Sequence, residues 1–364
     1  MTELGIVPGI VATEASIEID GQENARLSAG LLDLVVEETT EGLYRCEARF
    51  GNWGTIDGAV GYVYFNRDVL DFGKSLVVRL GAGEGEGEVF RGRITALESQ
   101  YSRSSPASVT VLAEDRAQDL RMVRRSRAFE EMTDADVFSQ IAGEHGLQPD
   151  IDADGPSHAL LAQVNQSDLA FIRERARWLD AEVWLDDRTL HVQSRTRRTP
   201  AGQDLSLTLD QGLLEFTVGA DLARQHTSVV ASGWDVGAKD VISFEATDSA
   251  ISSELAGAES GAGILSSAFG DRVDQLVHAV PLSSSEAEAL AQATFRAQAR
   301  RFVCGNGLAM GDARLRVGAT VSINGAGTPF EGAYYVSRVR HVFIRRPGGG
   351  YRTEFSVERP GLGR

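Results

Sequence analysis

Carboxylates are the side chains with the greatest capacity for chemistry in this chain, because 52 of its 364 residues are Asp or Glu. A retaining glycosidase needs two carboxyl groups roughly 5 Å apart in a cleft, one of them in an apolar setting. No pair is marked out by its spacing or its neighbours, and the motifs Gly-x-Ser-x-Gly and His-Glu-x-x-His do not occur. We therefore assign no catalytic residue and expect no enzyme activity. Cell-wall hydrolysis by a glycosidase is kept as an alternative.

The glycine-rich stretch GAGEGEGE at residues 81–88 has a superficial likeness to a phosphate-binding loop. Such a loop needs Lys-Ser/Thr after its glycines, or a position between a strand and a helix. Here glutamates alternate with the glycines and would repel a phosphate, and a strand pattern follows. We interpret the stretch as a flexible hairpin tip.

Metal and cofactor chemistry finds no support in the sequence either. The two cysteines, Cys46 and Cys304, make no zinc site and suggest no disulfide framework. Cys46 alternates with Tyr44 and Phe50 in a strand pattern, which predicts a buried thiol. The histidines are scattered without metal-ligand spacing: His145, His158, His191, His226, His278 and His341. We predict no metal site and no cofactor.

Charge and hydropathy exclude further classes of function. The formal net charge is −16 and the pI is near 4.9, whereas a nucleic-acid binder needs a basic footprint to neutralise phosphates. No apolar run approaches the roughly 20 residues of a membrane-spanning helix. The N-terminal sequence, MTELGIVPGIVATEAS, lacks the basic and long apolar regions of a signal peptide. We expect synthesis in the cytoplasm, no membrane segment and no sequence-specific nucleic-acid binding.

The clearest local pattern lies in residues 163–193. Ser167 is placed to cap a helix, and the acidic Asp168 suits the first turn. An apolar stripe at helical spacing follows, formed by Leu169, Phe171, Ile172, Ala176, Trp178 and Leu179. The period then changes to two on either side of a turn at 186–188, which predicts a two-stranded hairpin.

The rest of the chain is predicted to be mainly β. Short alternating strands in residues 15–114, and again from residue 205 (including 227–234), indicate a sandwich or barrel in each region. The last strands are placed at 315–323, 333–344 and 351–358. Four arginines, Arg121, Arg124, Arg125 and Arg127, are interpreted as an ion-pair strip within or between subunits.

Two further helices carry capping signals. Thr133 should cap a helix over residues 134–145 that stops at Gly146. Ser283-x-x-Glu286 should open an Ala-rich helix that runs to about Phe302 and is ended by Gly305. Between the two β regions, residues 195–203 contain Pro200 and Gly202 and are predicted to be a linker.

The pattern Gln-x-x-x-Ser-Asp-Leu-x-Phe-x-x-x-x-Ala-x-x-Leu from Gln163 to Leu179, with the hairpin after it, resembles the core of the phage late control protein D family. The C-terminal pieces Gly-Ala-Thr-Val (318–321), Phe-x-Gly-x-Tyr-Tyr-Val (330–336) and Gly-Tyr-Arg-Thr-Glu-Phe (350–355) are similar to that family's ending. The family comprises the tail hubs of contractile phages and related injection machines, including the hub part of the type VI secretion spike. The resemblance implies a homotrimer that joins a hexameric inner tube to a three-fold spike.

The two β regions also resemble one another. Gly73, a strand, a glycine-bearing loop and Phe-Arg-Gly (90–92) are matched by Gly318, a strand, a glycine-bearing loop and Phe-Glu-Gly (330–332). A chain with two similar barrels, assembled as a trimer, would present six similar barrels in a ring. Such a ring could meet a six-fold partner, with polar, mainly acidic side chains lining its lumen. Chance similarity between unrelated hairpins is the alternative.

These observations predict a mainly β chain with α+β insertions, in which two tube-like β-barrels are separated by a small helix-hairpin domain. The boundaries expected are 1–129 for the first barrel, 130–200 for the helix-hairpin domain and 201–364 for the second barrel, with a mainly helical insertion at about 248–306. Through the resemblance, the expected function is a structural baseplate hub, made in the bacterial cytoplasm and assembled into a phage tail or similar particle. Its expected partners are two further copies of itself, the inner tube protein, a spike protein on a separate chain and other baseplate proteins. A carbohydrate-binding β-sandwich adhesin is a further alternative.

Overall fold

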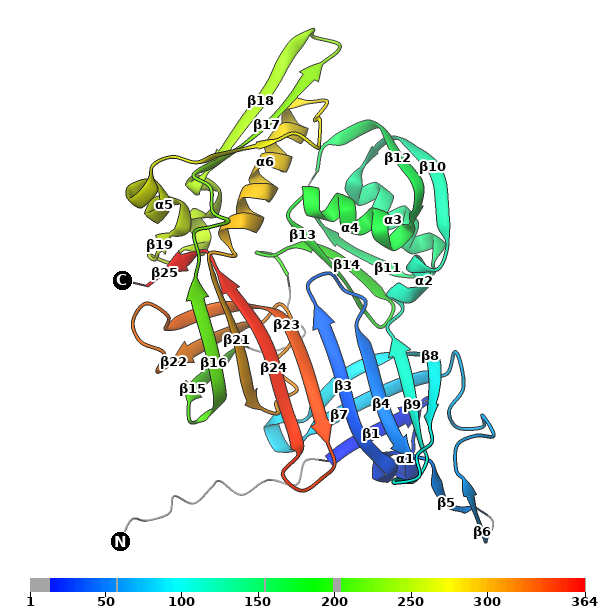
Figure 1. The fold of residues 1–364 in the computed structure, drawn as a ribbon. Helices are drawn as coiled ribbons and strands as arrows, with labels where there is room; N and C mark the ends of the chain where they lie inside the picture. The colour runs from blue at the N-terminus through cyan, green and yellow to red at the C-terminus, as the bar shows by residue number, and fades with distance from the viewer. Residues whose placement is uncertain (1–13, 57, 154, 199–203, 364) are drawn as a thin grey trace, which may run out of the picture.

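The computed structural model describes residues 14–56, 58–153, 155–198 and 204–363. Eight strands, each antiparallel to its neighbours, lie side by side and form the front of the molecule in Figure 1. In spatial order these strands are β16 (Gly212–Ala220), β21 (Val303–Met310), β24 (Gly350–Arg359), β23 (Gly332–Ile344), β3 (Leu31–Thr39), β4 (Arg45–Gly51), β9 (Ser108–Glu114) and β8 (Gly87–Gln100).

Each half of this sheet curls into a barrel. In the second half, β22 (Thr320–Asn324) pairs with β23 and β15 (Leu205–Leu209) joins β22 to β16, which closes a six-stranded barrel. In the first half, β7 (Ser75–Gly81) pairs with β8 and β1 (Glu14–Ile19) pairs with β7. The short helix α1 (Ala25–Gly30) then leads directly into β3. The prediction of a mainly β fold with two similar barrels is confirmed.

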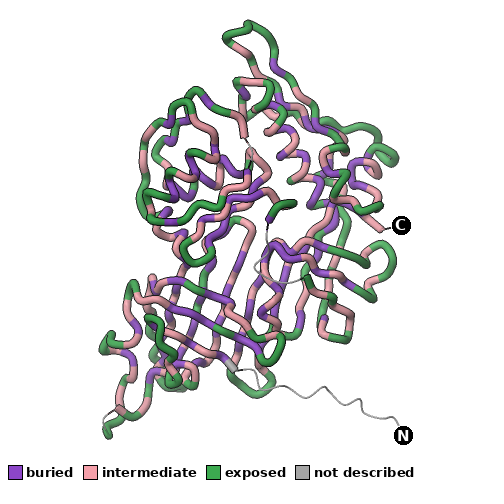
Figure 2. Tube along the Cα trace, turned by 180° about the vertical axis from the view of Figure 1, so that it is seen from behind, coloured by how far each residue is buried: buried purple, intermediate pink, exposed green. Residues whose placement is uncertain are grey.

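Two smaller units sit above the barrels in Figure 1. The middle unit contains the helices α2 (Ala117–Arg121), α3 (Asp134–Glu144) and α4 (Asp168–Trp178), and the strands β10 (Arg124–Thr133), β11 (Gln148–Asp152), β12 (Ser157–Ser167), β13 (Ala181–Asp186) and β14 (Thr189–Ser194). The other unit contains β17 (Ser228–Asp235), β18 (Asp240–Thr247), β20 (Val273–Leu276), α5 (Gly261–Phe269) and α6 (Ser284–Ala299). Each barrel and each unit has its own hydrophobic cluster, and buried residues recur along the strands in Figure 2.

The predicted helix starts are confirmed. The Ser167 hydroxyl accepts from the backbone N–H of Ala170, and Thr133 forms a capping box with Asp136. Helix α6 is capped by Ser283 as expected, but it ends at Ala299 rather than near Phe302. The prediction that Gly305 ends that helix was wrong.

Gly305 instead lies in β21, where a Cβ atom would overlap the ring of Phe216. Glycine here serves close packing in a barrel, which an Ala-rich run before it does not reveal. Two strand predictions also need correction. Strand β22 begins at Thr320 and not at Leu315, and residues 227–234 belong to the separate sheet of β17, β18 and β20 rather than to a barrel.

The resemblance between the barrels extends to single hydrogen bonds. Gly73 donates its backbone N–H to the carbonyl of Ile94 at 2.8 Å, and Gly318 donates to the carbonyl of Val336 at 3.0 Å. Both glycines have positive φ, 79° and 91°. The same turn therefore opens the same hairpin in each barrel.

A β-bulge is also repeated in the strand that follows. In β8 the extra residue is Thr95, and its hydroxyl donates to the carbonyl of Leu112 at 3.3 Å. In β23 the extra residue is Ser337, and its hydroxyl donates to the carbonyl of Ser356, also at 3.3 Å. Bulges are specific local features, so a shared bulge with a shared side-chain bond favours duplication over chance.

The two Phe-x-Gly motifs, however, do not occupy equivalent positions. Gly92 pairs with Leu76, whereas the residue that pairs with the corresponding Val321 is Tyr334. The motif of the second barrel therefore lies two residues earlier than its apparent partner. The hydrogen-bond register therefore aligns the two barrels correctly, whereas an alignment on the two Phe-x-Gly motifs is wrong by two residues.

The repeated glycines make a matched pair for substitution. Gly73→Ala should lower the free energy of unfolding by about 1–2 kcal/mol, because alanine at positive φ is strained. Gly318→Ala should cost about 1–3 kcal/mol more, because its Cβ would overlap Nε of the buried Arg198, whereas nothing lies within 4 Å of a Cβ at position 73. Urea denaturation of the two variants would measure the difference. Equal losses would contradict the assignment of Arg198 as a packed neighbour.

Candidate functional site

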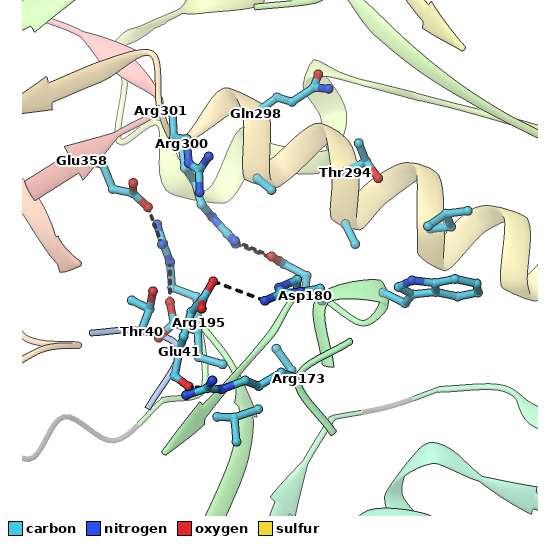
Figure 3. Close-up of a pocket in the computed structure, with 18 of the residues that line it drawn as sticks. Thr40, Glu41, Arg173, Asp180, Arg195, Thr294, Gln298, Arg300, Arg301 and Glu358 are labelled. Carbon is cyan, nitrogen blue, oxygen red and sulfur yellow. Dashed lines mark hydrogen bonds and ion pairs between the residues drawn. The ribbon is translucent and has the colours of Figure 1, made fainter. Parts of the chain in front are cut away.

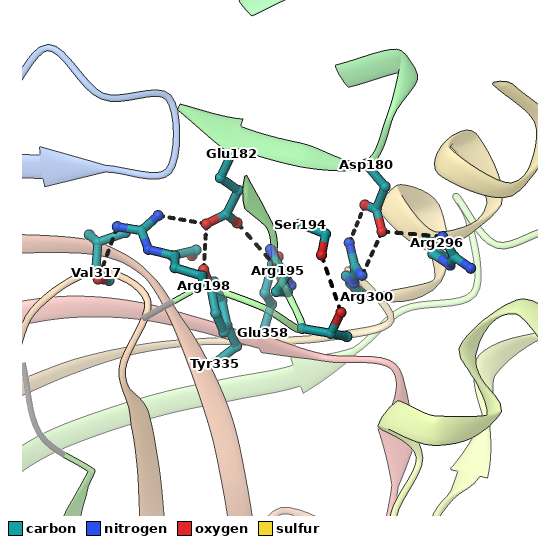
Figure 4. Close-up of polar contacts among 12 residues, drawn as sticks. Asp180, Glu182, Ser194, Arg195, Arg198, Arg296, Arg300, Val317, Tyr335 and Glu358 are labelled. Atoms are coloured by element: carbon teal, nitrogen blue, oxygen red, sulfur yellow. Dashed lines mark hydrogen bonds and ion pairs between the residues drawn. The ribbon is translucent and has the colours of Figure 1, made fainter. Parts of the chain in front are cut away.

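Charged side chains meet at the junction between the barrels and the middle unit (Figure 4). Glu182 on β13 stands at its centre. One carboxylate oxygen accepts from Arg198 Nη1 at 2.6 Å and from the hydroxyl of Tyr335, and the other accepts from Arg195 Nε at 3.3 Å. Burial, then the charge of Glu182, raises the pKa of the Tyr335 hydroxyl well above its ordinary value, so Tyr335 acts as a donor.

Arg198 extends this junction to both barrels. Its Nη2 donates to the hydroxyl of Tyr44 at 3.2 Å and to the carbonyl of Val317 at 3.1 Å. Its guanidinium carbon lies 4.1 Å from the ring centroid of Trp184 on β13, a cation–π contact. One side chain therefore holds the first barrel, the second barrel and the middle unit together.

A second group of ion pairs connects helix α6 to the same place. Arg300, at the end of α6, donates Nη2 to Asp180 at 2.9 Å and to Glu254 at 2.7 Å. Asp180 lies in the turn between α4 and β13. Arg195 also pairs with Glu358 on β24. The two groups of ion pairs together contact both barrels, the middle unit and the unit that contains α6.

A cleft of about 450 Å³ opens beside this network, between α4, α6 and β13 (Figure 3). Its carboxylates are held by arginines: Asp180 by Arg300, and Glu358 by Arg195. A general acid needs a protonated carboxyl in an apolar setting, and an arginine partner opposes that protonation. Burial nevertheless raises the pKa of Asp180 against the effect of Arg300. Both carboxylates are engaged in ion pairs within the chain.

A third charged cluster ties the middle unit to α6 through His158 on β12. Its Nε2 lies 2.9 Å from Asp134 and its Nδ1 lies 2.7 Å from Glu286 on α6. Two carboxylates, which accept when ionised, favour a ring protonated on both nitrogens, and the donor Arg175 Nη2, 3.1 Å from Nε2, opposes it. The hydrogen bond with Asp134 raises the pKa of His158 against the opposing effects of burial and of Arg175. Arg175 holds the other side of Asp134, with Nε at 2.6 Å.

His158→Gln should make stability less dependent on pH. Because the folded-state pKa of His158 is raised above the ordinary 6.5, its contribution is fully present below pH 6.5 and is lost as the pH rises through the folded-state value. The parental protein should therefore exceed the variant in melting temperature by more at pH 6 than at pH 9. A calorimetric series over that range would measure this, and a constant or growing difference would contradict it.

Two further buried titratable groups serve the packing of the barrels. Glu38 on β3 pairs with Arg316 and accepts from the backbone N–H of Val317 at 3.3 Å. His341 is fully buried and its Nδ1 shares a hydrogen bond of 2.7 Å with the hydroxyl of Tyr351. Burial, then the charge of Arg316, holds the pKa of His341 well below its ordinary value. This histidine is neutral and structural.

Asp115 has the type of perturbed carboxyl that an acid catalyst would use. Burial raises its pKa to about 7. Yet one oxygen accepts from the backbone N–H of Tyr44 at 2.8 Å and the other from that of Ala117 at 2.9 Å, and the residue is only 5 % exposed. Asp115 therefore binds backbone at the start of α2 with both oxygens, although it also lines a cleft of about 340 Å³ beside Arg116 and Arg316.

Several sequence predictions can be placed directly. The Cys46 thiol is buried, as expected. The predicted arginine strip makes ion pairs within the chain, for example Arg121 with Glu114, and Arg127 with Glu144. The loop at 81–88 is more than a flexible tip, because it forms a 3₁₀ turn at Gly83–Gly85 and the carbonyl of Gly85 accepts from the second barrel.

The arginines of the junction were missed by sequence reasoning. Arg195 and Arg198 fall in the predicted linker, yet the side chains of both are largely buried and ion-paired with Glu182. Residues 199–203 of that linker lie outside the described part of the chain. No sequence signal distinguishes these arginines from solvated ones, because their partners are distant in sequence.

Within the described ranges, no cluster of three or more His, Cys, Asp or Glu residues is arranged to hold a metal ion. None of the helices in those ranges has the length and apolar character required to cross a membrane.

Solved structures with the same fold include phage tail proteins. The 43 kDa tail protein of prophage MuSo2 from Shewanella oneidensis has a TM-score of 0.70 at 13% identity, over 96% of this chain and 99% of that one. A tail protein from Neisseria meningitidis has a TM-score of 0.67 at 14% identity, over 97% and 98%. A type VI secretion component from E. coli, described as structurally similar to the T4 tail proteins gp27 and gp5, has a TM-score of 0.52 at 13% identity, over 96% and 79%. These likenesses establish a fold shared with phage tail proteins.

No curated protein matches the sequence. A family model described as the Alg8 N-terminal domain matches residues 55–344, from the β5 strand (Trp53–Ile56) to the end of β23, and the chain therefore belongs to the Alg8 N-terminal domain family.

Proposed function

We propose that this chain is a structural baseplate hub of a contractile tail or injection system, of the late control protein D type. Three copies would form a ring of six similar barrels that joins a hexameric inner tube to a spike protein on a separate chain. The observation that carries the proposal is the duplication, in which two barrels share a glycine turn and a bulge bonded in the same way. Two like barrels per chain in a trimer reconcile three-fold with six-fold symmetry.

The role proposed is one of assembly rather than catalysis. The buried junction around Glu182 and Arg198 would fix the angle between the two barrels, and the middle unit would brace them from one side. The tail proteins that share the fold support this role. We infer three domains as expected near 1–129, 130–200 and 201–364, with the first boundary moved to about residue 115 because α2 and β10 belong to the middle unit. Other baseplate proteins are the further partners, and a phage tail or similar particle is the final location.

The exposed face of the eight-stranded sheet is the surface we assign to the lumen. Its charged side chains alternate in sign along and across the strands. Asp33 pairs with Arg49, and Glu37 pairs with both Arg45 and Arg338. The channel wall would therefore carry arginines among its acids, in place of the mainly acidic lining expected from net charge.

Mass measurement in solution tests the proposal. The full chain, alone or mixed with the inner tube protein of its particle, should give a species of three times 39.2 kDa that nucleates short tubes. A species that stays monomeric with the tube protein present and hydrolyses cell wall would refute the hub and favour a glycosidase. A carbohydrate-binding β-sandwich is disfavoured because the second barrel is closed.

A further inference from the structure

The eight-stranded sheet has two open edges, at β8 and at β16. Strand β8 pairs with β9 as far as Gln100, but its other side is paired only up to Arg93, by β7. Strand β16 pairs with β21 as far as Ala220, but β15 meets its other side only at Gly212 and Leu213. Among the described residues, no strand covers the remainder of either edge.

The duplication identifies the strands of the opposite barrel that are equivalent to these two open edges. Ile94 on β8 and Val336 on β23 occupy equivalent positions in the two barrels. Following the paired residues from strand to strand in each barrel makes β23 the counterpart of β8 and β16 the counterpart of β3. The agreement includes a second shared irregularity, between Leu31 and Asp33 in β3 and between Leu213 and Glu215 in β16. Within the chain, β3 and the second half of β23 pair with each other and join the two barrels.

Side chains are more deeply buried on the paired strands β3 and β23 than at the equivalent positions of the open strands β16 and β8. Four inward residues at the β3–β23 seam are fully buried: Leu34, Val36, Val339 and His341, all 0 % exposed. Their counterparts at the open edges are Phe216, Val218, Leu97 and Ser99. The first three are only partly buried and Ser99 is exposed. An uncovered edge with apolar inward residues is unstable toward pairing with another chain.

We propose that β8 of one copy pairs antiparallel with β16 of the next, as a repeat of the β3–β23 seam. The register follows from the seam within the chain. Val342 faces Val35 there, which places Gln100 opposite Thr217 between chains, and Arg340 faces Glu37, which places Glu98 opposite Gly219. Three chains joined in this way would form a continuous ring of 24 strands, three times eight. The inference rests on the proposed trimer and specifies its interface.

Disulfide trapping tests the register. Gln100→Cys and Thr217→Cys would be combined in a Cys304→Ser background, because Cys304 is exposed beside Gly219. Both positions are exposed and lie at opposite ends of the sheet, so a bond between them must join two chains. Mild oxidation should give covalent trimers on a denaturing gel. The matched control Glu98→Cys with Thr217→Cys is shifted by two residues, about 7–8 Å between Cα atoms, and should link poorly.

The possible outcomes separate this interface from the hub proposal. A native trimer that links at Gln100 and Thr217 but not in the control supports both. A native trimer that fails to link, or links equally in the control, overturns the strand pairing and leaves the hub intact. A chain that is monomeric even with the tube protein overturns both. As a readout without substitution, amide hydrogens on residues 214–220 should exchange at least tenfold more slowly in the trimer than in dilute monomer, and equal exchange would also overturn the pairing.

Discussion

Glu182→Gln should lower the free energy of unfolding by about 3–5 kcal/mol, because it leaves a buried arginine without a counter-charge. Arg198 has a side chain only 1 % exposed, and Glu182 is its carboxylate partner. An arginine cannot release its proton to escape this cost. The effect on Arg195 is smaller, because Arg195 remains paired with the carboxylate of Glu358. Urea denaturation followed by tryptophan fluorescence would measure the loss, with Trp184 stacked on Arg198 as a local reporter.

Glu41→Gln is the matched control for this substitution. Glu41 lines the same cleft and pairs with Arg177 at 3.3 Å, but both side chains are 61 % exposed. Solvent-exposed pairs contribute little, so this variant should lose less than about 1 kcal/mol. If the two substitutions had the same effect, the junction would not be the buried centre that positions the barrels.

Local signals explain which parts of the fold could be predicted from the sequence. The helix that begins after Ser167 is predicted by its N-cap, by its apolar stripe and by the change from helical to strand periodicity at the hairpin. Each of these signals involves residues within one or two turns of each other. The capping box at Thr133 is equally local and was equally reliable.

Features that depend on distant partners could not be predicted in the same way. Arg198 appears in a Pro/Gly-bearing segment that reads as a solvated linker, and its engagement with Tyr44 and Val317 is created only by the tertiary fold. Gly305 follows an Ala-rich helix and resembles a helix stop, but its role is to admit the ring of Phe216. For both residues, the deciding neighbour is far away in the chain.

The repeat lies between these two cases. Similar sequences in the two β regions predicted the repeat, yet their Phe-x-Gly motifs are two residues out of register in the structure. The bulges at Thr95 and Ser337 are the true markers, and either residue alone is unremarkable in a sequence. A Ser or Thr in a strand becomes informative only when the ladder shows that it is the extra residue.

Asp134→Asn should be about as destabilising as the loss of Glu182, at about 3–5 kcal/mol near neutral pH. The Asp134 side chain is completely buried, and it accepts from Arg175 Nε at 2.6 Å and Nη2 at 3.0 Å and from His158 Nε2 at 2.9 Å. Removing its charge leaves Arg175 without a carboxylate partner and deprives His158 of one of its two carboxylate partners. The unit that contains α6 would loosen with the middle unit, because His158 also lies within hydrogen-bond distance of Glu286 on α6. Thermal unfolding and hydrogen exchange at α3, α4 and α6 would measure both effects.

A matched control and the pH dependence of stability both test the role of Asp134. Asp187→Asn makes the same chemical change at an exposed hairpin turn with φ of 46°, a conformation that asparagine tolerates, and should stay within about 0.5 kcal/mol of the parent. Although burial opposes it, bonding to His158 and Arg175 holds the pKa of Asp134 below its ordinary 3.8. The stability it supplies is present above that value and is lost as the pH falls through the folded-state pKa. The gap between parent and Asp134→Asn should therefore be full at pH 7 and narrow in strong acid, and a gap that widened with acidification would show that Asp134 is not the charged member of this cluster.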